Sequence, residues 1–236
     1  MASPRKKTAP DPEYVPADGS APASLIVAAT DQAFLIAKDS AFNICDFISN
    51  KSMWAFRTID ECEKELDRIE RTVDGILPKA ITHVAETRAR ELLACSRVVT
   101  ELERITDLVM SAAHGVRRAG ADLGAQDRRD LLKMGEMIQK MVEGLHAVFT
   151  SRDLHEVGPI IRADGEIDRL RSAVFRRHTT GRTAKPHDPV AIFFVAQALE
   201  RAGDHGTNIA EEAYRLIAGG TLRHLPAREK RSKLGR

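Results

Sequence analysis

Aromatic residues, prolines and cysteines are all scarce in this chain of 236 residues. Aromatic side chains make up 5% of the sequence, and apolar residues make up 43% without the alternating pattern of strands. This composition favours an all-helical fold over a sandwich or barrel. The three cysteines, Cys45, Cys62 and Cys95, are odd in number and show no pairing pattern. They predict reduced thiols in a cytoplasmic protein rather than a disulfide framework.

A large charge imbalance and a long apolar run are also missing. The formal net charge is +2, so the total charge indicates no nucleic-acid partner. No apolar run reaches the roughly 20 residues that cross a bilayer, and no apolar segment follows the basic residues near the start. We therefore expect a cytoplasmic protein that is peripheral to a membrane at most.

The two ends of the chain differ in composition from the middle. Residues 1–23 hold five of the ten prolines, which predicts a disordered N-terminal tail. Residues 222–236 form a basic C-terminal tail with six Lys or Arg and one acidic residue. A solvated tail and a docking segment for an acidic partner or an anionic membrane surface are both consistent with that composition.

The strongest positive feature is an internal repeat. The heptapeptides Leu102–Leu108 (LERITDL) and Leu199–His205 (LERAGDH) lie 97 residues apart. Apolar residues at spacings of three and four surround both, and two earlier apolar segments recur at offsets of 97 and 101 residues. The pattern predicts an all-α protein made of two tandem three-helix bundles, over residues 24–118 and 122–217.

Acidic pairs recur with this repeat. Each pair places two carboxylates four residues apart, so that both lie on one face of a helix. Two pairs fall on successive helices of each repeat, where a hairpin would bring them side by side. The paired residues are Glu63 with Asp67, Glu103 with Asp107, Asp164 with Asp168, and Glu200 with Asp204.

The position of these pairs predicts the turns and the exposure of the carboxylates. Pairs that lie side by side require a turn at about residues 80–86, with Pro78 inside the preceding helix. The second hairpin turns before Asp188, which we expect to cap a helix that begins at Pro189. The pairs Glu103 with Asp107 and Glu200 with Asp204 would lie at heptad positions b and f. We therefore expect their carboxylates on the outside or shoulder of the bundles, not in the interior.

The segment Leu199–Glu212, LERAGDHGTNIAEE, resembles the signature of the PhoU family of phosphate-signalling regulators. The resemblance covers roughly residues 24–217. In the first repeat the signature has Thr106 in place of a glycine, and Ser111 where the second repeat has Asn208. The family is built from two three-helix bundles whose acidic pairs bind multinuclear metal clusters, usually of iron. The resemblance therefore implies metal at the acidic pairs, and more securely in the second repeat.

The chemistry of the ligands restricts the metal. Carboxylate oxygens suit hard cations, so manganese, magnesium and calcium are alternatives to iron. His205 follows Asp204 directly, but its heptad position faces elsewhere, and we do not assign it as a ligand. The competing interpretation is a solvated helix face, because Arg104 and Arg201 lie three residues before Asp107 and Asp204.

An enzymatic role is not expected from this sequence. Di-iron bundles use a Glu-x-x-His motif twice, whereas here it occurs once, from Glu143 to His146. No nucleophile with a base and no glycine-rich phosphate loop after a strand stands out.

The resemblance implies a regulator that represses phosphate-uptake genes when phosphate is plentiful. Its implied partners are the ATPase of a phosphate ABC transporter and the sensor kinase of a two-component system. Two alternatives remain open: an accessory subunit of a low-affinity phosphate permease, and a helical scaffold that needs no metal. The family commonly dimerises, and the long amphipathic helices also lead us to expect a homodimer.

Overall fold

The computed structural model describes residues 20–120, 123–180 and 188–220, and these ranges contain helices and no strand. The all-α fold class is therefore confirmed. In chain order, the elements are α1 (Ser20–Asn50), α2 (Met53–Ile81), α3 (Glu86–Arg118), α4 (Ala125–Ser151), the short 3₁₀ helix η1 (Leu154–Glu156), α5 (Val157–Thr180) and α6 (Pro189–Ala218).

The helix boundaries follow from local sequence. The hydroxyl of Ser52 accepts a hydrogen bond from the backbone N–H of Ala55 at 3.2 Å and caps α2. Asp188 caps α6 as expected, with Pro189 in its first turn. The turn between α2 and α3 occupies residues 82–85, and Pro78 lies within α2, both as the acidic pairs predict. The remainder of the second turn, residues 181–187, lies outside the described residues.

The first helix begins earlier than the composition predicts. Residues 20–23, assigned above to a disordered tail, are helical, and Ala23 is buried. Pro22 does not prevent this, because a proline in the first helical turn loses no hydrogen bond that the helix would otherwise form. Residues 1–19 of the predicted N-terminal tail lie outside the described residues. The predicted basic tail, residues 222–236, lies outside them as well.

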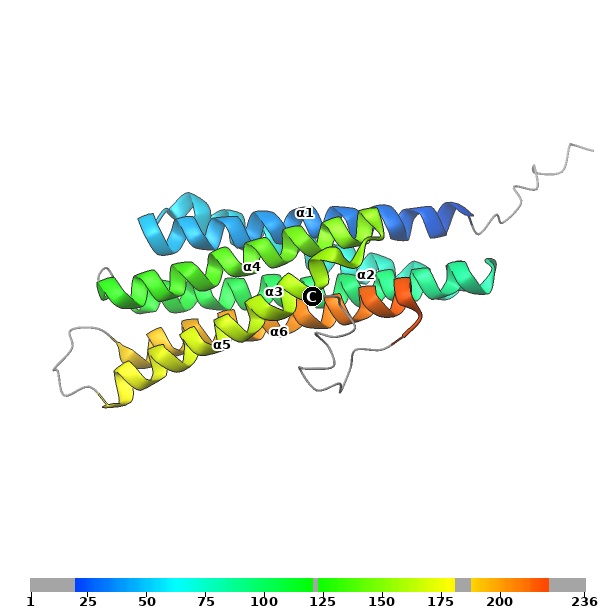
Figure 1. Cartoon of the computed structure of the whole chain (residues 1–236). Coiled ribbons are helices and arrows are strands. Elements are labelled where there is room, and N and C mark those ends of the chain that lie inside the picture. The colour runs from blue at the N-terminus through cyan, green and yellow to red at the C-terminus, as the bar shows by residue number, and fades with distance from the viewer. Residues whose placement is uncertain (1–19, 121–122, 181–187, 221–236) are drawn as a thin grey trace, which may run out of the picture.

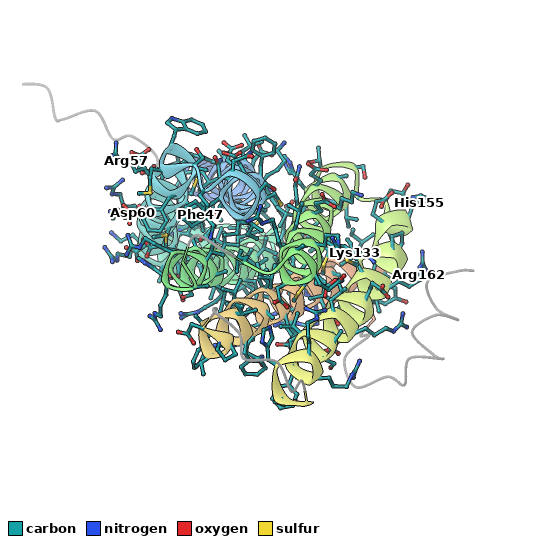
Figure 2. The ribbon with its side chains drawn as sticks, turned by 90° about the vertical axis from the view of Figure 1, so that its left-hand side faces the viewer. Phe47, Arg57, Asp60, Lys133, His155 and Arg162 are labelled. Carbon is teal, nitrogen blue, oxygen red and sulfur yellow. The ribbon has the colours of Figure 1, made fainter. Side chains whose placement is uncertain are left out.

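The helices pack as two groups of three that share one apolar interior. Helices α1, α2 and α3 contact one another, and so do α4, α5 and α6. The groups meet where α3 runs along α6 and α1 lies against α4 (Figure 1). Buried apolar side chains from all six α-helices form one continuous cluster. In the view along the helices, Phe47 points into this interior, while Arg57 and Asp60 of α2 point outwards (Figure 2).

A glycine lies at the contact between α3 and α6. A Cβ atom at Gly115 of α3 would lie 2.5 Å from Cγ2 of Val195 of α6. The Val195 side chain therefore fills the space that a side chain at position 115 would need. None of the described helices is both long and apolar enough to cross a bilayer.

Candidate functional site

Helices α2 and α3 bring acidic residues together in the first repeat. Glu103 lies on α3, with Asp107 one turn later on the same helix. The carboxylates that act on Glu103 are those of Glu70 and Asp67 from α2 and of Asp107. We call these four residues the first acidic site.

Glu103 is the member of the first acidic site whose carboxylate has a buried oxygen without a hydrogen bond. Its side chain is 13% exposed, and its Oε2 atom is buried without a hydrogen-bond partner. The nearest cation is the Nε atom of Arg104, at 3.5 Å from that oxygen. Burial raises the pKa of Glu103, Arg104 opposes the shift, and the charges of Glu70, Asp107 and Asp67 raise it further. The site therefore favours either a proton or an external cation at Glu103.

In the second repeat an arginine pairs with the glutamate that corresponds to Glu103. Nη2 of Arg171, from α5, lies 3.2 Å from Oε1 of Glu200 on α6 and 3.8 Å from Oδ1 of Asp168. Gln197 donates a hydrogen bond to the other oxygen of Glu200 at 2.6 Å. Both carboxylate oxygens of Glu200 thus have partners within the protein. We call Asp168, Arg171, Glu200 and Asp204 the second acidic site.

In the second acidic site the pKa values of Glu200 and Asp204 are still raised. Burial raises the pKa of Glu200, Arg171 lowers it, and Asp204 and Asp168 raise it. Burial also raises the pKa of Asp204, and Asp168 adds to that shift while His205 and Arg171 oppose it. The guanidinium of Arg171 lowers the pKa of both carboxylates of α6, so it supplies part of the positive charge that an external cation could supply.

The exposure of the carboxylates agrees only partly with the heptad argument. Asp107 and Asp204 are exposed, as predicted, and Asp168 of the earlier helix is exposed as well. Glu200 is buried, with 9% of the residue exposed, so its assignment to the outside of the bundle was wrong. Glu103, predicted at the same heptad position, is also largely covered, with 13% of its side chain exposed. A heptad position describes one helix and its core seam, whereas Glu200 also contacts the neighbouring helix α5, which supplies Arg171.

The other two predicted residues, Glu63 and Asp164, have different neighbours. Glu63 lies four residues before Asp67 on α2, and its charge acts on the adjacent Lys64. Asp164 lies against Gly203 of α6, where a Cβ atom would come within 3.3 Å of Asp164 Oδ1. Glu70 and Arg171, each three residues after a predicted aspartate, were not predicted as site residues. The 101-residue offset between α2 and α5 pairs these two positions, and that offset was the signal that could have found them.

The two sites suit a metal ion to different degrees. Within residues 20–120, 123–180 and 188–220, no three His, Cys, Asp or Glu side chains form a group that could hold one metal ion. A hard cation bound through one or two carboxylates and completed by water does not need such a group. In the first acidic site Oε2 of Glu103, which has no hydrogen-bond partner and lies 3.5 Å from Arg104, fits that mode. In the second acidic site Arg171 already faces Glu200 and Asp168.

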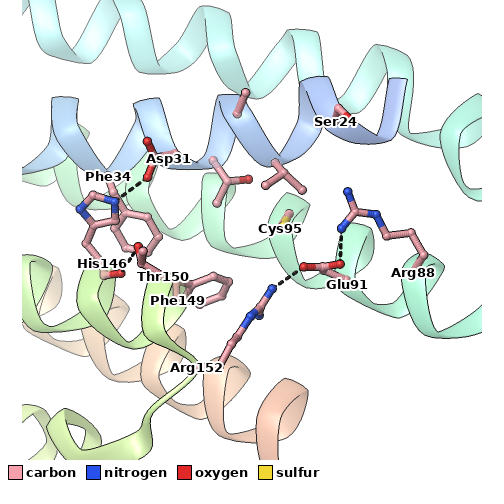
Figure 3. A pocket seen from close by; sticks show the side chains of 13 residues that line it. Ser24, Asp31, Phe34, Arg88, Glu91, Cys95, His146, Phe149, Thr150 and Arg152 are labelled. Carbon is pink, nitrogen blue, oxygen red and sulfur yellow. Dashed lines mark hydrogen bonds and ion pairs between the residues drawn. The ribbon is translucent and has the colours of Figure 1, made fainter. Parts of the chain in front are cut away.

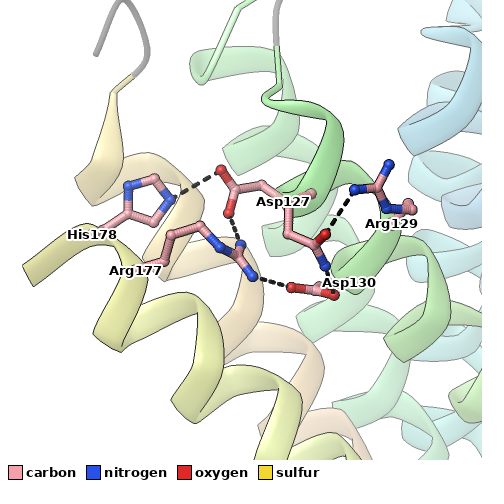
Figure 4. A network of polar contacts seen from close by, with 6 residues as sticks. Asp127, Arg129, Asp130, Arg177 and His178 are labelled. Atoms are coloured by element: carbon pink, nitrogen blue, oxygen red, sulfur yellow. Dashed lines mark hydrogen bonds and ion pairs between the residues drawn. The ribbon is translucent and has the colours of Figure 1, made fainter. Parts of the chain in front are cut away.

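A separate polar network fixes α4 against α5. Arg177 of α5 donates hydrogen bonds to Asp127 and Asp130 of α4, both of which are buried (Figure 4). The ring of His178 lies 3.1 Å from Oδ2 of Asp127, and Gln126 donates to Asp130 at 2.8 Å. The network compensates two buried carboxylates and holds the ends of the two helices together.

Comparisons with known proteins agree with the arrangement of the helices. A family model described as the PhoU domain matches residues 131–213. A "Phosphate-specific transport system accessory protein PhoU homolog" of Rhizobium meliloti is 30% identical over 163 residues, 65% of this chain and 68% of that protein. A protein of the same description from Zymomonas mobilis is 28% identical over 176 residues, 72% of this chain and 73% of its own length.

Solved structures show the same fold. The crystal structure of the phosphate transport system regulatory protein PhoU from Streptococcus pneumoniae superposes with a TM-score of 0.76 at 15% identity, over 86% of this chain and 99% of that one. The crystal structure of PhoU from Pseudomonas aeruginosa gives 0.75 at 20% identity, over 85% and 99%. The Rhizobium meliloti protein is 30% identical over two thirds of its length and the PhoU domain model matches the second half of this chain, so this chain belongs to the PhoU family.

Proposed function

We propose that this protein regulates phosphate uptake, and that it represses the phosphate-starvation response when phosphate is plentiful. The observation that carries the proposal is its 30% identity to a relative named as an accessory protein of a phosphate-specific transport system. Its partners in this proposal are the ATPase of a phosphate ABC transporter and the sensor kinase of a two-component system. The named relatives are accessory or regulatory proteins rather than enzymes, and the role proposed here is likewise non-catalytic.

Genetic complementation tests the regulatory role. A bacterium that lacks its own PhoU protein and carries a reporter for a phosphate-starvation promoter is expected to express that reporter at high phosphate. Expression of this chain should restore repression. If repression is not restored in the native organism's own deletion strain either, the regulatory role is wrong. Location of the gene beside a low-affinity permease, instead of an ABC transporter, would favour the permease-subunit alternative.

The first acidic site supports a second part of the proposal, a hard cation bound beside Glu103. The donors are the carboxylates of Asp67, Glu70, Glu103 and Asp107, with water completing the coordination. Iron is the metal that the family resemblance implies, and manganese and magnesium share the same preference for oxygen ligands. Because Arg171 compensates the second acidic site, we propose weaker binding there. This order is the reverse of the one that the degraded signature of the first repeat suggests.

Thermal melts of matched variants test the order of the two sites. A cation that binds the folded state raises its stability by RT ln(1 + [L]/Kd), about 2.7 kcal/mol at 100 times the Kd. We expect manganous or ferric ion to raise the melting temperature of the wild type. Glu103→Gln should remove most of this response, and Glu200→Gln should leave most of it. Loss of the response in Glu200→Gln alone would contradict the proposed order, and a wild type without any response would favour the metal-free scaffold.

Self-association and location complete the proposal. We propose a homodimer in the cytoplasm, in which exposed apolar side chains of α1 contribute to the contact. Leu25, Leu35 and Phe42 are 60%, 43% and 56% exposed, and they lie on one side of α1 at spacings of ten and seven residues. Exposed apolar groups aligned on one helix face are typical of contact surfaces.

A further inference from the structure

A cavity of about 460 Å³ lies between α1, α3 and α4, away from both acidic sites. Because α1 and α3 belong to the first repeat and α4 to the second, the cavity is built by both. Its apolar walls include Val27 and Phe34 of α1, Cys95 of α3 and Phe149 of α4. Figure 3 shows Phe149 facing the cavity between its two polar ends.

One end of the cavity carries an excess of positive charge. Arg88 of α3 and Arg152, which follows α4, both donate hydrogen bonds to Glu91 of α3 (Figure 3). Two guanidinium groups thus share one carboxylate, which leaves one positive charge without a compensating group among these three residues. The backbone of Arg152 has a φ of 59° at the end of α4, so its side chain leaves the helix toward α3. A bound anion would complete the charge balance at this end.

The opposite end differs in charge. Asp31 of α1 and the ring of His146 of α4 are joined at 2.6 Å, and that ring stacks on Phe34 with centroids 5.1 Å apart. The Asp31 carboxylate makes this end unfavourable for a second anionic group. The cavity therefore offers one anion-binding end, an apolar middle with aromatic rings, and an end that can accept a hydrogen bond.

We infer that this cavity binds an amphipathic organic anion, whose carboxylate, sulfonate or phosphate head pairs with Arg88 and Arg152 and whose apolar body lies against Phe149 and Val27. A cavity of this volume lies within the range of small-molecule sites in proteins. A ligand in it touches α1, α3 and α4 together. Its binding thus stabilises the contact between the two repeats, independently of any cation at the acidic sites.

Anilinonaphthalene sulfonate is a suitable probe, because it joins an aromatic body to one sulfonate and fluoresces in apolar surroundings. We expect saturable binding to the folded wild type. Arg88→Gln and Arg152→Gln should each weaken it about tenfold, since each removes one charged donor to the head group. Arg152→Lys should retain most of the affinity. Arg57→Gln, which makes the same charge change on the outer face of α2, is the matched control and should leave binding unchanged.

One variant is expected to bind the sulfonate more tightly, a result that unfolding of the protein could not produce. Glu91→Gln removes the carboxylate that competes for both arginines, so it should tighten binding of the sulfonate several-fold. Val27→Phe should fill part of the cavity and weaken it. The uncharged analogue N-phenylnaphthylamine should bind more weakly than the sulfonate and should not respond to Arg88→Gln. Displacement by decanoate or by phenyl phosphate then distinguishes a carboxylate head from a phosphate head.

Two results would overturn the inference. The first is sulfonate binding that is unchanged, or weakened, in folded Glu91→Gln. The second is binding that survives Arg88→Gln and Arg152→Gln but is lost in Arg97→Gln or Arg215→Gln. Those two arginines share Glu212, at 3.0 and 2.6 Å, in a groove between α3 and α6, and such a result would place the anion there instead.

Discussion

The two repeats place similar helices in similar positions but treat buried charge differently. The offset of 101 residues pairs Glu70 of α2 with Arg171 of α5. In the first repeat this position adds a negative charge next to Glu103, and in the second it supplies a guanidinium to Glu200. In the first repeat Arg71 pairs with Asp67 on the same helix and Arg104 lies 3.5 Å from Glu103, which leaves two of the four carboxylates for an external cation to neutralise. In the second repeat an arginine of the facing helix reaches Glu200 and reduces the negative charge there.

The same contrast appears in a second helix pair, α4 with α5, and its counterpart α1 with α2. The second repeat has Arg177 with buried Asp127 and Asp130, where the offsets place Ile76, Thr30 and Ala33 in the first. Thr30 and Ala33 are buried, and Ile76 packs against the apolar core. One fold can thus hold the same helices together through charges or through apolar contacts. The two repeats thus share their apolar core positions but differ at the positions that carry charge in the second repeat.

Conversion of the ionic contact into the apolar one tests this equivalence and has the largest expected effect. Arg177→Ile should lower the free energy of unfolding by about 3 kcal/mol, because it leaves two buried carboxylates without their main partner. The triple variant that also carries Asp127→Thr and Asp130→Ala should recover most of the loss. Urea denaturation gives both values. A triple variant as unstable as the single one would show that the first repeat's residues cannot replace the network.

Exchange of the residues at the paired positions should have the next largest effect. Arg171→Glu gives the second acidic site the composition of the first, and without added metal it should cost about 2 kcal/mol, since Glu200 loses its guanidinium. Manganous ion should then stabilise the variant more than it stabilises the wild type. Glu70→Arg, the reverse exchange, should remove the cation response of the first site. If Arg171→Glu does not respond to cations, Arg171 is not the reason for the weaker cation binding proposed at the second acidic site.

A smaller effect is expected from pH. The pKa of Glu103 lies above its ordinary value of 4.5, so the folded state holds this proton more tightly than the unfolded chain. The stability of the wild type therefore declines as pH rises from that ordinary value through the raised pKa. Glu103→Gln lacks this decline, so it should gain stability over the wild type at pH 7 and lose that advantage near pH 4. Melting curves across this range, without metal, measure the difference.

The smallest expected effect on the fold concerns the outer face of α1. Phe42 is 56% exposed, and the offset of 97 residues pairs it with Gln139 of α4. Phe42→Gln should leave the melting temperature of the fold nearly unchanged and should weaken a homodimer at micromolar concentration. Sedimentation equilibrium measures the change. A wild type that remains at 26 kDa at high concentration would remove the homodimer from the proposal.

Periodicity in the sequence was sufficient to predict the helices and several of their ends. Asp188 and Pro189 predicted the start of α6, and the spacing of the acidic pairs predicted the turn before α3. These features depend on residues close together in the chain. The start of α1 at Ser20 was missed because the prolines of residues 1–23 were taken as one tail, although Pro22 fits the first turn of a helix.

The candidate sites were predicted less completely, since they depend on contacts between helices. The repeat located Asp67, Glu103, Asp168 and Glu200, but it did not show which side chains stand opposite them. Arg171 and Glu200 are 29 residues apart, and only the register of α5 against α6 brings them together. A signature confined to α6 therefore could not reveal that its buried glutamate already has a cationic partner.

The close contact of Gly115 with Val195 has a consequence for how the molecule unfolds. Because α3 and α6 interlock there and share one apolar core, neither repeat can lose its structure without exposing the other's interior. The duplicated halves should melt in one cooperative transition, in the manner of a single domain. An ion or small molecule bound in either half thus protects the whole chain, and a protease that cleaves the unfolded state would register that protection in both halves equally.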